Sequence, residues 1–118
     1  LVNFAHKELY TVEQRIEESR KMIKRFPDRV PVIVQRISGS TIPEMDKHKF
    51  LVPHDVSVAQ FMWVIRRRIN IGSEQAIFIF VDNTIPQSSS TMGQLYDTHK
   101  DLDGFLYVAY SGENSFGA

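Results

Sequence analysis

Few side chains in this sequence have the types and spacings that enzymatic chemistry requires. The four histidines show no i, i+4 pair and no HExxH pattern, so we expect them on the surface rather than around a metal ion. Ser88–Ser90 lack a GxSxG turn, and neither a GxxxxGK[ST] nor a GxGxxG phosphate loop occurs. A small hydrolase stays only as a minor alternative. The sequence thus predicts no catalytic residue, no metal site and no cofactor.

The composition is typical of a soluble single domain. The chain has 118 residues, of which 42% are hydrophobic, and its 14 basic and 14 acidic residues give a formal net charge of zero. This balance argues against broad electrostatic binding of nucleic acid or anionic lipid. The absence of cysteine excludes disulfides, thiol catalysis and thiolate metal sites. The longest apolar run, Ala76–Val81, is far shorter than the ~20 residues that span a bilayer.

Helix starts are marked by three [ST]-x-x-Q capping boxes, at Thr11, Ser57 and Thr91. We expect the corresponding helices to end before Pro27, near Asn70 with Gly72 as terminator, and at His99. The first helix carries apolar residues at Val12, Ile16 and Ile23 with Ser19 between them, which is a modest amphipathic pattern. A shorter helix at Val2–Lys7 is only weakly indicated.

Four segments are typical of β-strands: Val30–Ile37, Lys49–Pro53, Ala76–Val81 and Phe105–Tyr110. Ala76–Val81 is apolar on both faces, which favours a central strand, whereas the short, proline-closed Lys49–Pro53 favours a sheet edge. The order ββαβαβ predicts an α+β fold, the ubiquitin-like β-grasp with two additional N-terminal helices covering its second face. We divide the chain into a helical extension at 1–29, a β-grasp core at 30–110 and a tail at 111–118.

Two apolar residues of the second capped helix, Trp63 and Val64, lie off its core-facing side. Either neighbouring segments cover them, or they are exposed and extend an apolar trough beside the edge strand. Such an edge binds extended peptides, and Lys47 and Lys49 would favour acidic residues in the ligand. Arg66–Arg68 point in three directions on a helix, so they cannot form one flat cationic face. They are either solvated cations that favour the helix C-terminus, or contacts for an acidic partner.

The C-terminal residues Ser115–Ala118 say little by themselves. In a ubiquitin-like domain, however, a glycine without a Cβ atom can thread the narrow sites of enzymes that pass a carboxylate between thiols. Ala118 would then block the carboxylate of Gly117 until it is removed.

Sequence motifs along most of the chain resemble one protein family. The segments that carry the resemblance are Phe26–Val34, Asp46-Lys47, Phe50–Pro53, Gln60-Phe61, Val64–Ile69, Ala76–Val81, Met92–Tyr96 and Gly104–Val108. Together they resemble the autophagy ubiquitin-like modifiers of the GABARAP and microtubule-associated light-chain type, from about Val12 to Gly117.

This resemblance implies a modifier that catalyses nothing itself. A processing cysteine protease would cleave after Gly117, and activating and conjugating enzymes would join Gly117 to phosphatidylethanolamine during autophagosome formation. Arg68, Phe78 and Phe80 match residues for recognition by the processing enzyme. The protein would be cytoplasmic, and on the autophagosome membrane once lipidated. The alternative is a trafficking adaptor whose tail is never processed.

The resemblance also implies cargo receptors with aromatic-x-x-aliphatic motifs. The residues that match the aromatic pocket are Glu18, Met22, Pro31, Lys49, Leu51 and Phe105. Those that match the aliphatic pocket are Phe50, Val52, Pro53, Val56, Phe61 and Val64. Arg29 and Lys47 match flanking charge contacts.

Overall fold

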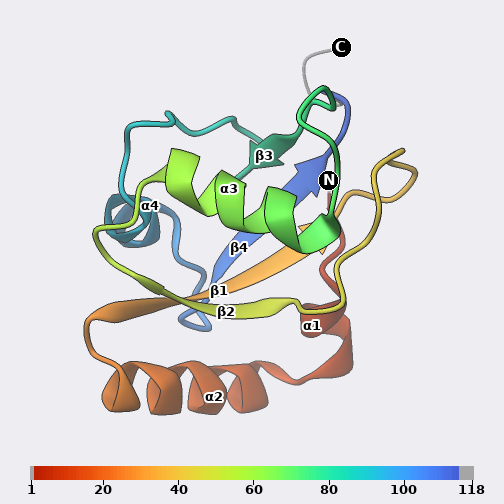
Figure 1. The fold of residues 1–118 in the computed structure, drawn as a ribbon. Coiled ribbons are helices and arrows are strands. Elements are labelled where there is room, and N and C mark those ends of the chain that lie inside the picture. Colours follow the sequence, from red (N-terminus) through yellow and green to blue (C-terminus); the bar gives the residue numbers. More distant parts are fainter. Residues whose placement is uncertain (1, 115–118) are drawn as a thin grey trace.

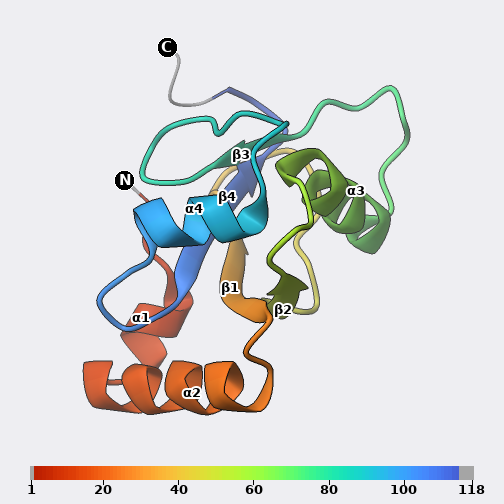
Figure 2. The same ribbon diagram turned by 90° about the vertical axis from the view of Figure 1, so that its left-hand side faces the viewer.

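A mixed four-stranded sheet organises the fold. The computed structural model describes residues 2–114. Its elements are α1 (Ala5–Leu9), α2 (Val12–Arg25), β1 (Arg29–Arg36), β2 (Lys49–Pro53), α3 (Val58–Ile69), β3 (Phe78–Phe80), α4 (Met92–His99) and β4 (Leu106–Ser111). The strand order is β2-β1-β4-β3; β1 and β4 are parallel, and the two outer pairs are antiparallel. Figures 1 and 2 place α2 and α3 on opposite sides of the β1–β2 hairpin.

The capping boxes position the helices as the sequence predicts. The Thr11 side chain accepts a hydrogen bond from the Gln14 N–H while the Gln14 side chain accepts one from the Thr11 N–H, and the other two boxes repeat this arrangement. The α3 helix ends near Asn70, as predicted, but the terminating residue differs from the prediction. Asn70 itself adopts the left-handed region at φ 55° and ends α3, rather than Gly72. An asparagine tolerates this conformation better than most residues.

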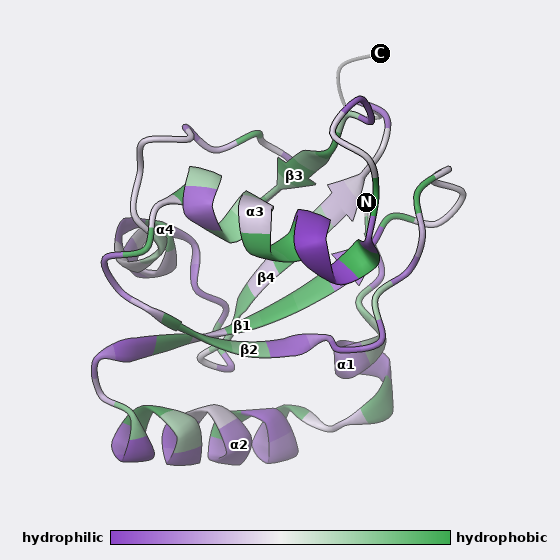
Figure 3. Cartoon of the chain, in the orientation of Figure 1, coloured by the Kyte–Doolittle hydropathy of each residue, from purple (hydrophilic) through white to green (hydrophobic). Residues whose placement is uncertain are grey.

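Alternation along the strands separates two apolar layers. The strand residues that share the α3 face are Val30, Val32, Val34, Phe50, Val52, Leu106, Val108 and Tyr110, and all are buried. They pack with Phe61, Ile65 and Ile69 of α3. Figure 3 shows the resulting contrast between hydrophobic β1 and largely hydrophilic α2. The opposite face of the sheet carries α1 and α2, as expected for the additional helices.

The prediction of a central strand at Ala76–Val81 was wrong. β3 covers only Phe78–Phe80, lies at the end of the sheet and pairs with β4 alone among the described residues. Its apolar character has a different cause, because Ile79 packs into the core and Phe80, on the other face of the sheet, is also buried. Burial of both residues, rather than a strand on each side, accounts for the apolar sequence of β3.

Candidate functional site

The outer edge of β2 is open within the part of the chain that the structure describes, because β2 pairs only with β1. Backbone hydrogen bonds from Val34 N–H to His48 and from His54 N–H to Asp28 bracket this pairing. Since hydrogen-bonded pairs alternate along an antiparallel ladder, the backbone groups of Lys49 and Leu51 must point outward. An extended chain could hydrogen-bond to them.

On the α2 side of β2, the structure brings together all six residues predicted for the aromatic pocket. Leu51 lies opposite Pro31 in the strand register, and both face α2 with Phe105. Phe105 and Pro31 are buried and form the floor, whereas Met22 and Leu51 are half-buried. Lys49 and Glu18 form an ion pair between β2 and α2, over the floor of this α2-side pocket.

On the α3 side, Phe50, Val52 and Phe61 of the residues predicted for the aliphatic pocket share one buried core cluster. Pro53 does not join them, because it follows Val52 in β2 and so alternates to the side of Leu51. Phe50 and Phe61 form a buried edge-to-face pair with ring centroids 5.8 Å apart. Val64 is 44% exposed at the rim, and Val56 packs partly buried against the same core. The two predicted pockets therefore lie on either side of one edge strand, because successive β2 side chains alternate between its faces.

The structure decides whether Trp63 is covered by neighbouring segments or exposed. Trp63 is 62% exposed, so neighbouring segments do not cover it, and with Gln60, Val64 and Arg67 it lines a groove of about 480 Å³ on α3. The predicted flanking cations are Lys47, whose ammonium lies 4.9 Å from the Phe50 ring centroid, and Arg29, whose guanidinium lies 5.6 Å from that of Phe26.

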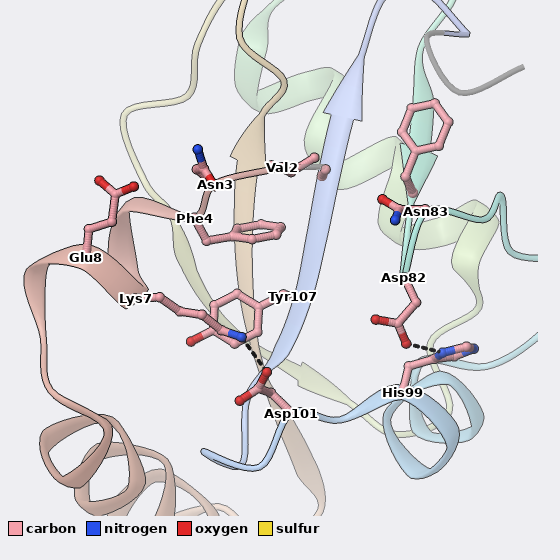
Figure 4. A pocket seen from close by; sticks show the side chains of 12 residues that line it. Val2, Asn3, Phe4, Lys7, Glu8, Asp82, Asn83, His99, Asp101 and Tyr107 are labelled. Carbon is pink, nitrogen blue, oxygen red and sulfur yellow. Dashed lines mark hydrogen bonds and ion pairs between the residues drawn. The ribbon is translucent and has the colours of Figure 1, made fainter. Parts of the chain in front are cut away.

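The three residues predicted for recognition by the processing enzyme, Arg68, Phe78 and Phe80, do not form one cluster. Arg68 is on α3 and pairs with Asp46 at 3.6 Å, whereas Phe78 and Phe80 point to the opposite face of the sheet. There Phe80 lines a cavity of about 390 Å³ with Tyr107, beside the Lys7–Asp101 ion pair and the Asp82–His99 hydrogen bond (Figure 4). Gly117 and Ala118 lie outside the described residues.

One histidine contradicts the expectation of surface positions. His6 is 8% exposed and packs edge-on against Phe105, with ring centroids 5.0 Å apart. Its Nε2 lies 3.3 Å from a carboxylate oxygen of Glu18, without the geometry of a hydrogen bond. Burial lowers the pKa of His6 and outweighs the opposing effect of Glu18. Sequence spacing could not reveal this position, because the contacts come from three separate elements.

A buried network that the sequence analysis missed fixes Phe105. Asp103, 1% exposed, accepts hydrogen bonds from Arg15 at 2.6 Å, from the Tyr107 hydroxyl at 2.5 Å and from the Phe105 N–H at 2.9 Å. Burial, together with Asp103, raises the pKa of Tyr107 well above its ordinary value. The network ties α2 to the start of β4. It therefore holds Phe105, in the floor of the α2-side pocket, at a fixed position relative to α2.

Two further features are absent from the described residues, a cluster of metal-binding side chains and a membrane-spanning helix. Among residues 2–114, no three His, Asp or Glu side chains gather as a metal site would require. No helix in that range is both long and apolar enough to cross a bilayer.

Comparisons with known proteins identify the family. The model described as "Autophagy protein Atg8 ubiquitin like" matches residues 14–117. Autophagy-related protein 8a of Arabidopsis thaliana is 50% identical over 91% of this chain and 88% of its own, and autophagy-related protein 8 of Candida glabrata is 54% identical over 92% of each.

Solved structures agree with the sequence matches. The crystal structure of Trypanosoma brucei ATG8 aligns with a TM-score of 0.86 at 42% identity, covering 90% of this chain and 91% of that one. Plasmodium falciparum Atg8 in complex with a Plasmodium falciparum Atg3 peptide aligns at 0.83 with 36% identity, covering 91% and 94%. These likenesses confirm the ubiquitin-like α+β fold. The chain belongs to the Atg8 family of autophagy ubiquitin-like proteins, which are modifiers and not enzymes.

Proposed function

We propose that this protein is joined through Gly117 to phosphatidylethanolamine and then recruits receptors that carry aromatic-x-x-aliphatic motifs. It would act in the cytoplasm and, once lipidated, on the autophagosome membrane. Family membership supports conjugation, and so does the relative solved with an Atg3 peptide. The observation that supports receptor binding best is the open edge of β2, with Leu51 facing α2 on one side and Phe50 and Val52 packed with α3 on the other.

Besides the lipid, processing and conjugation of Gly117 require only water and a nucleoside triphosphate as co-reactants. A cysteine protease adds water across the Gly117–Ala118 peptide bond and releases the part that begins with Ala118. The Gly117 carboxylate then attacks a nucleoside triphosphate and pyrophosphate leaves. A thiol of the activating enzyme displaces the nucleoside monophosphate to form a thioester, and the acyl group passes to a thiol of the conjugating enzyme as the first thiol leaves. The lipid amine attacks this carbonyl carbon, an amide forms, and the enzyme thiol leaves. Two acyl chains then hold the protein on a membrane far longer than one would.

Receptor binding would use the open edge of β2. An extended peptide pairs with the outward backbone groups of Lys49 and Leu51, and its aromatic and aliphatic side chains enter the α2-side and α3-side pockets. Lys47 and Arg29 attract acidic residues beside the motif. Many lipid-anchored copies would collect receptors multivalently on one membrane.

Conjugation is tested with protein ending at Gly117, the cognate activating and conjugating enzymes, and vesicles containing phosphatidylethanolamine. Intact-mass spectrometry should show the mass of the lipid added with loss of water, and Gly117→Ala should abolish the adduct. No adduct from the trimmed wild-type protein, with enzymes shown to be active on a relative, would contradict the proposal. Membrane association in cells that survives deletion of residues 116–118 would favour an unprocessed adaptor.

A further inference from the structure

A second groove lies on the other side of α2 from the α2-side pocket. Its apolar lining is Ile16 and Ile23 of α2 and Leu102 of the loop between α4 and β4, and its volume is about 370 Å³. We call this surface the α2–loop groove; its full lining is Ile16, Ser19, Arg20, Ile23, Lys24, Leu102, Asp103 and Gly104. Leu102 is 97% exposed, which is unusual for a large aliphatic side chain beside other apolar ones.

The loop that presents Leu102 is held in place from both sides. Asp101 pairs with Lys7 at 2.5 Å, and Asp103 pairs with Arg15 at 2.6 Å. The Ser19 hydroxyl also donates to the backbone carbonyl of Asp103 at 2.6 Å. Leu102 therefore faces solvent because its neighbours are fixed, and not because the loop lacks contacts.

The rim of the α2–loop groove is basic. Arg20 and Lys24 are exposed on α2, and neither forms an ion pair with another described residue. The two carboxylates that flank Leu102, Asp101 and Asp103, are already neutralised by Lys7 and Arg15. The charge left at the rim is thus positive and calls for acidic groups in whatever covers the groove.

We propose that the α2–loop groove binds an acidic amphipathic helix of a protein partner. Ile16 and Ile23 are seven residues apart, so they stand about 10.5 Å apart along α2, the same spacing as i and i+7 residues on a second helix. Leu102 adds a third apolar contact from outside α2. Acidic residues beside the partner's apolar stripe would meet Arg20 and Lys24.

Two other occupants fit the structure less well. In a symmetric pair of copies, the rims with Arg20 and Lys24 would meet each other, and like charges would repel. A membrane is disfavoured by position, an argument that rests on the proposed attachment at Gly117. β4 ends on the side of the molecule away from α2 (Figures 1 and 2), the molecule is 39 Å long, and six residues after Ser111 reach at most about 20 Å. The groove then faces away from the membrane that holds the tail.

The test uses the full chain and two synthetic peptides of roughly 18 residues, long enough to form a helix. Both carry Leu at i, i+4 and i+7; one is flanked by Glu and the other by Lys. The Glu peptide should bind and shift the backbone NMR signals of α2 and residues 101–104. The Lys peptide should bind at least about tenfold more weakly. Leu102→Ser should weaken the Glu peptide about tenfold, while Leu9→Ser, at an exposed leucine of α1, should not.

Reversing the charge of the groove's basic rim tests most directly whether that charge selects the acidic peptide. Arg20→Glu combined with Lys24→Glu should invert the preference, so that the Lys peptide binds more tightly than the Glu peptide. Both residues are exposed, so the fold should persist. Arg67→Glu on α3 is the matched control and should leave the preference unchanged.

Three outcomes would overturn the proposal. One is a Glu peptide that does not bind, or that binds equally to Leu102→Ser. Another is binding of wild-type but not Leu102→Ser protein to vesicles with anionic lipid, which would assign the groove to a membrane. The third is a dimer in sedimentation analysis that Leu102→Ser abolishes. Conjugation at Gly117 is read independently by mass, so failure of the proposed function and failure of this proposal are distinguishable.

Discussion

Glu18 on α2 and Lys49 on β2 form an ion pair that joins the helical and strand walls of the α2-side pocket. A ligand side chain that enters between the helix and the strand must separate these two groups. Both side chains are partly exposed, at 32% and 43%, so the pair contributes little to stability. It is therefore suited to opening when a ligand binds.

Glu18→Gln should tighten binding of a peptide with an acidic residue before its aromatic position. The change removes the ion pair that the ligand must break and leaves Lys49 free for the ligand's carboxylate. We expect a gain of about 0.5–1 kcal/mol, or two- to fivefold, measured by calorimetry, and a smaller gain at high salt. Glu17→Gln, whose partner Lys21 lies on the same helix, is the control. Weaker binding would show instead that Glu18 contacts the peptide directly.

Leu51→Ala and Val64→Ala should separate the two pockets. Leu51→Ala removes part of the α2-side wall and should weaken an aromatic-x-x-aliphatic peptide by about 1–3 kcal/mol. Its effect should largely vanish when the peptide's aromatic residue is replaced by Ala, whereas the effect of Val64→Ala should vanish with the aliphatic residue replaced. Double-mutant cycles measure both couplings. Equal coupling of Leu51 to both peptide positions would contradict the assignment of pockets.

Local signals predicted the elements that surround this site. A capping box involves residues three apart, so Thr11, Ser57 and Thr91 mark where α2, α3 and α4 begin. Alternation likewise predicted that residues of β2 would divide between two faces, and its proline and short length marked it as an edge.

Such local signals could not predict features that depend on contacts between segments far apart in the chain. Ile79 and Phe80 are both buried although β3 lies at the end of the sheet, so an apolar run was mistaken for a central strand. His6 is buried against Phe105, about a hundred positions away in the chain, and no spacing rule could anticipate it. The α2 stripe with Ile16 and Ile23 is only half-buried, because the buried contact of α2 is made by Ser19.

Asp103→Asn should destabilise the protein and loosen the α2-side pocket together. The substitution leaves Arg15, with a side chain only 12% exposed, without its carboxylate partner. Breaking a buried ion pair by removing one partner costs about 3–5 kcal/mol, and we expect a loss near the lower limit because Asn keeps some hydrogen bonds. Urea denaturation measures the loss.

Peptide affinity at a temperature where the Asp103→Asn variant stays folded tests the link to function. It should fall severalfold, because Phe105 and α2 no longer share a fixed anchor. Asp101→Asn, which removes the exposed pair with Lys7, should lower stability by less than about 1 kcal/mol and serves as the control. Unchanged stability of Asp103→Asn would mean that the network contributes nothing to the fold.

His6 should make folding stability depend on pH below about neutrality. Burial lowers its pKa in the folded protein below the ordinary 6.5, so at pH values between the two pKa values the unfolded chain binds more protons. Stability is then complete above pH 6.5 and falls as the pH drops. His6→Phe keeps an aromatic ring against Phe105 and removes this titration. The difference in unfolding free energy between wild type and His6→Phe, measured in urea at several pH values, should change in favour of the variant as the pH falls from 7.5 to 5. Contributions common to both proteins cancel from the difference. A wild-type protein that instead gained stability relative to the variant would show that attraction to Glu18 outweighs the burial of the imidazolium.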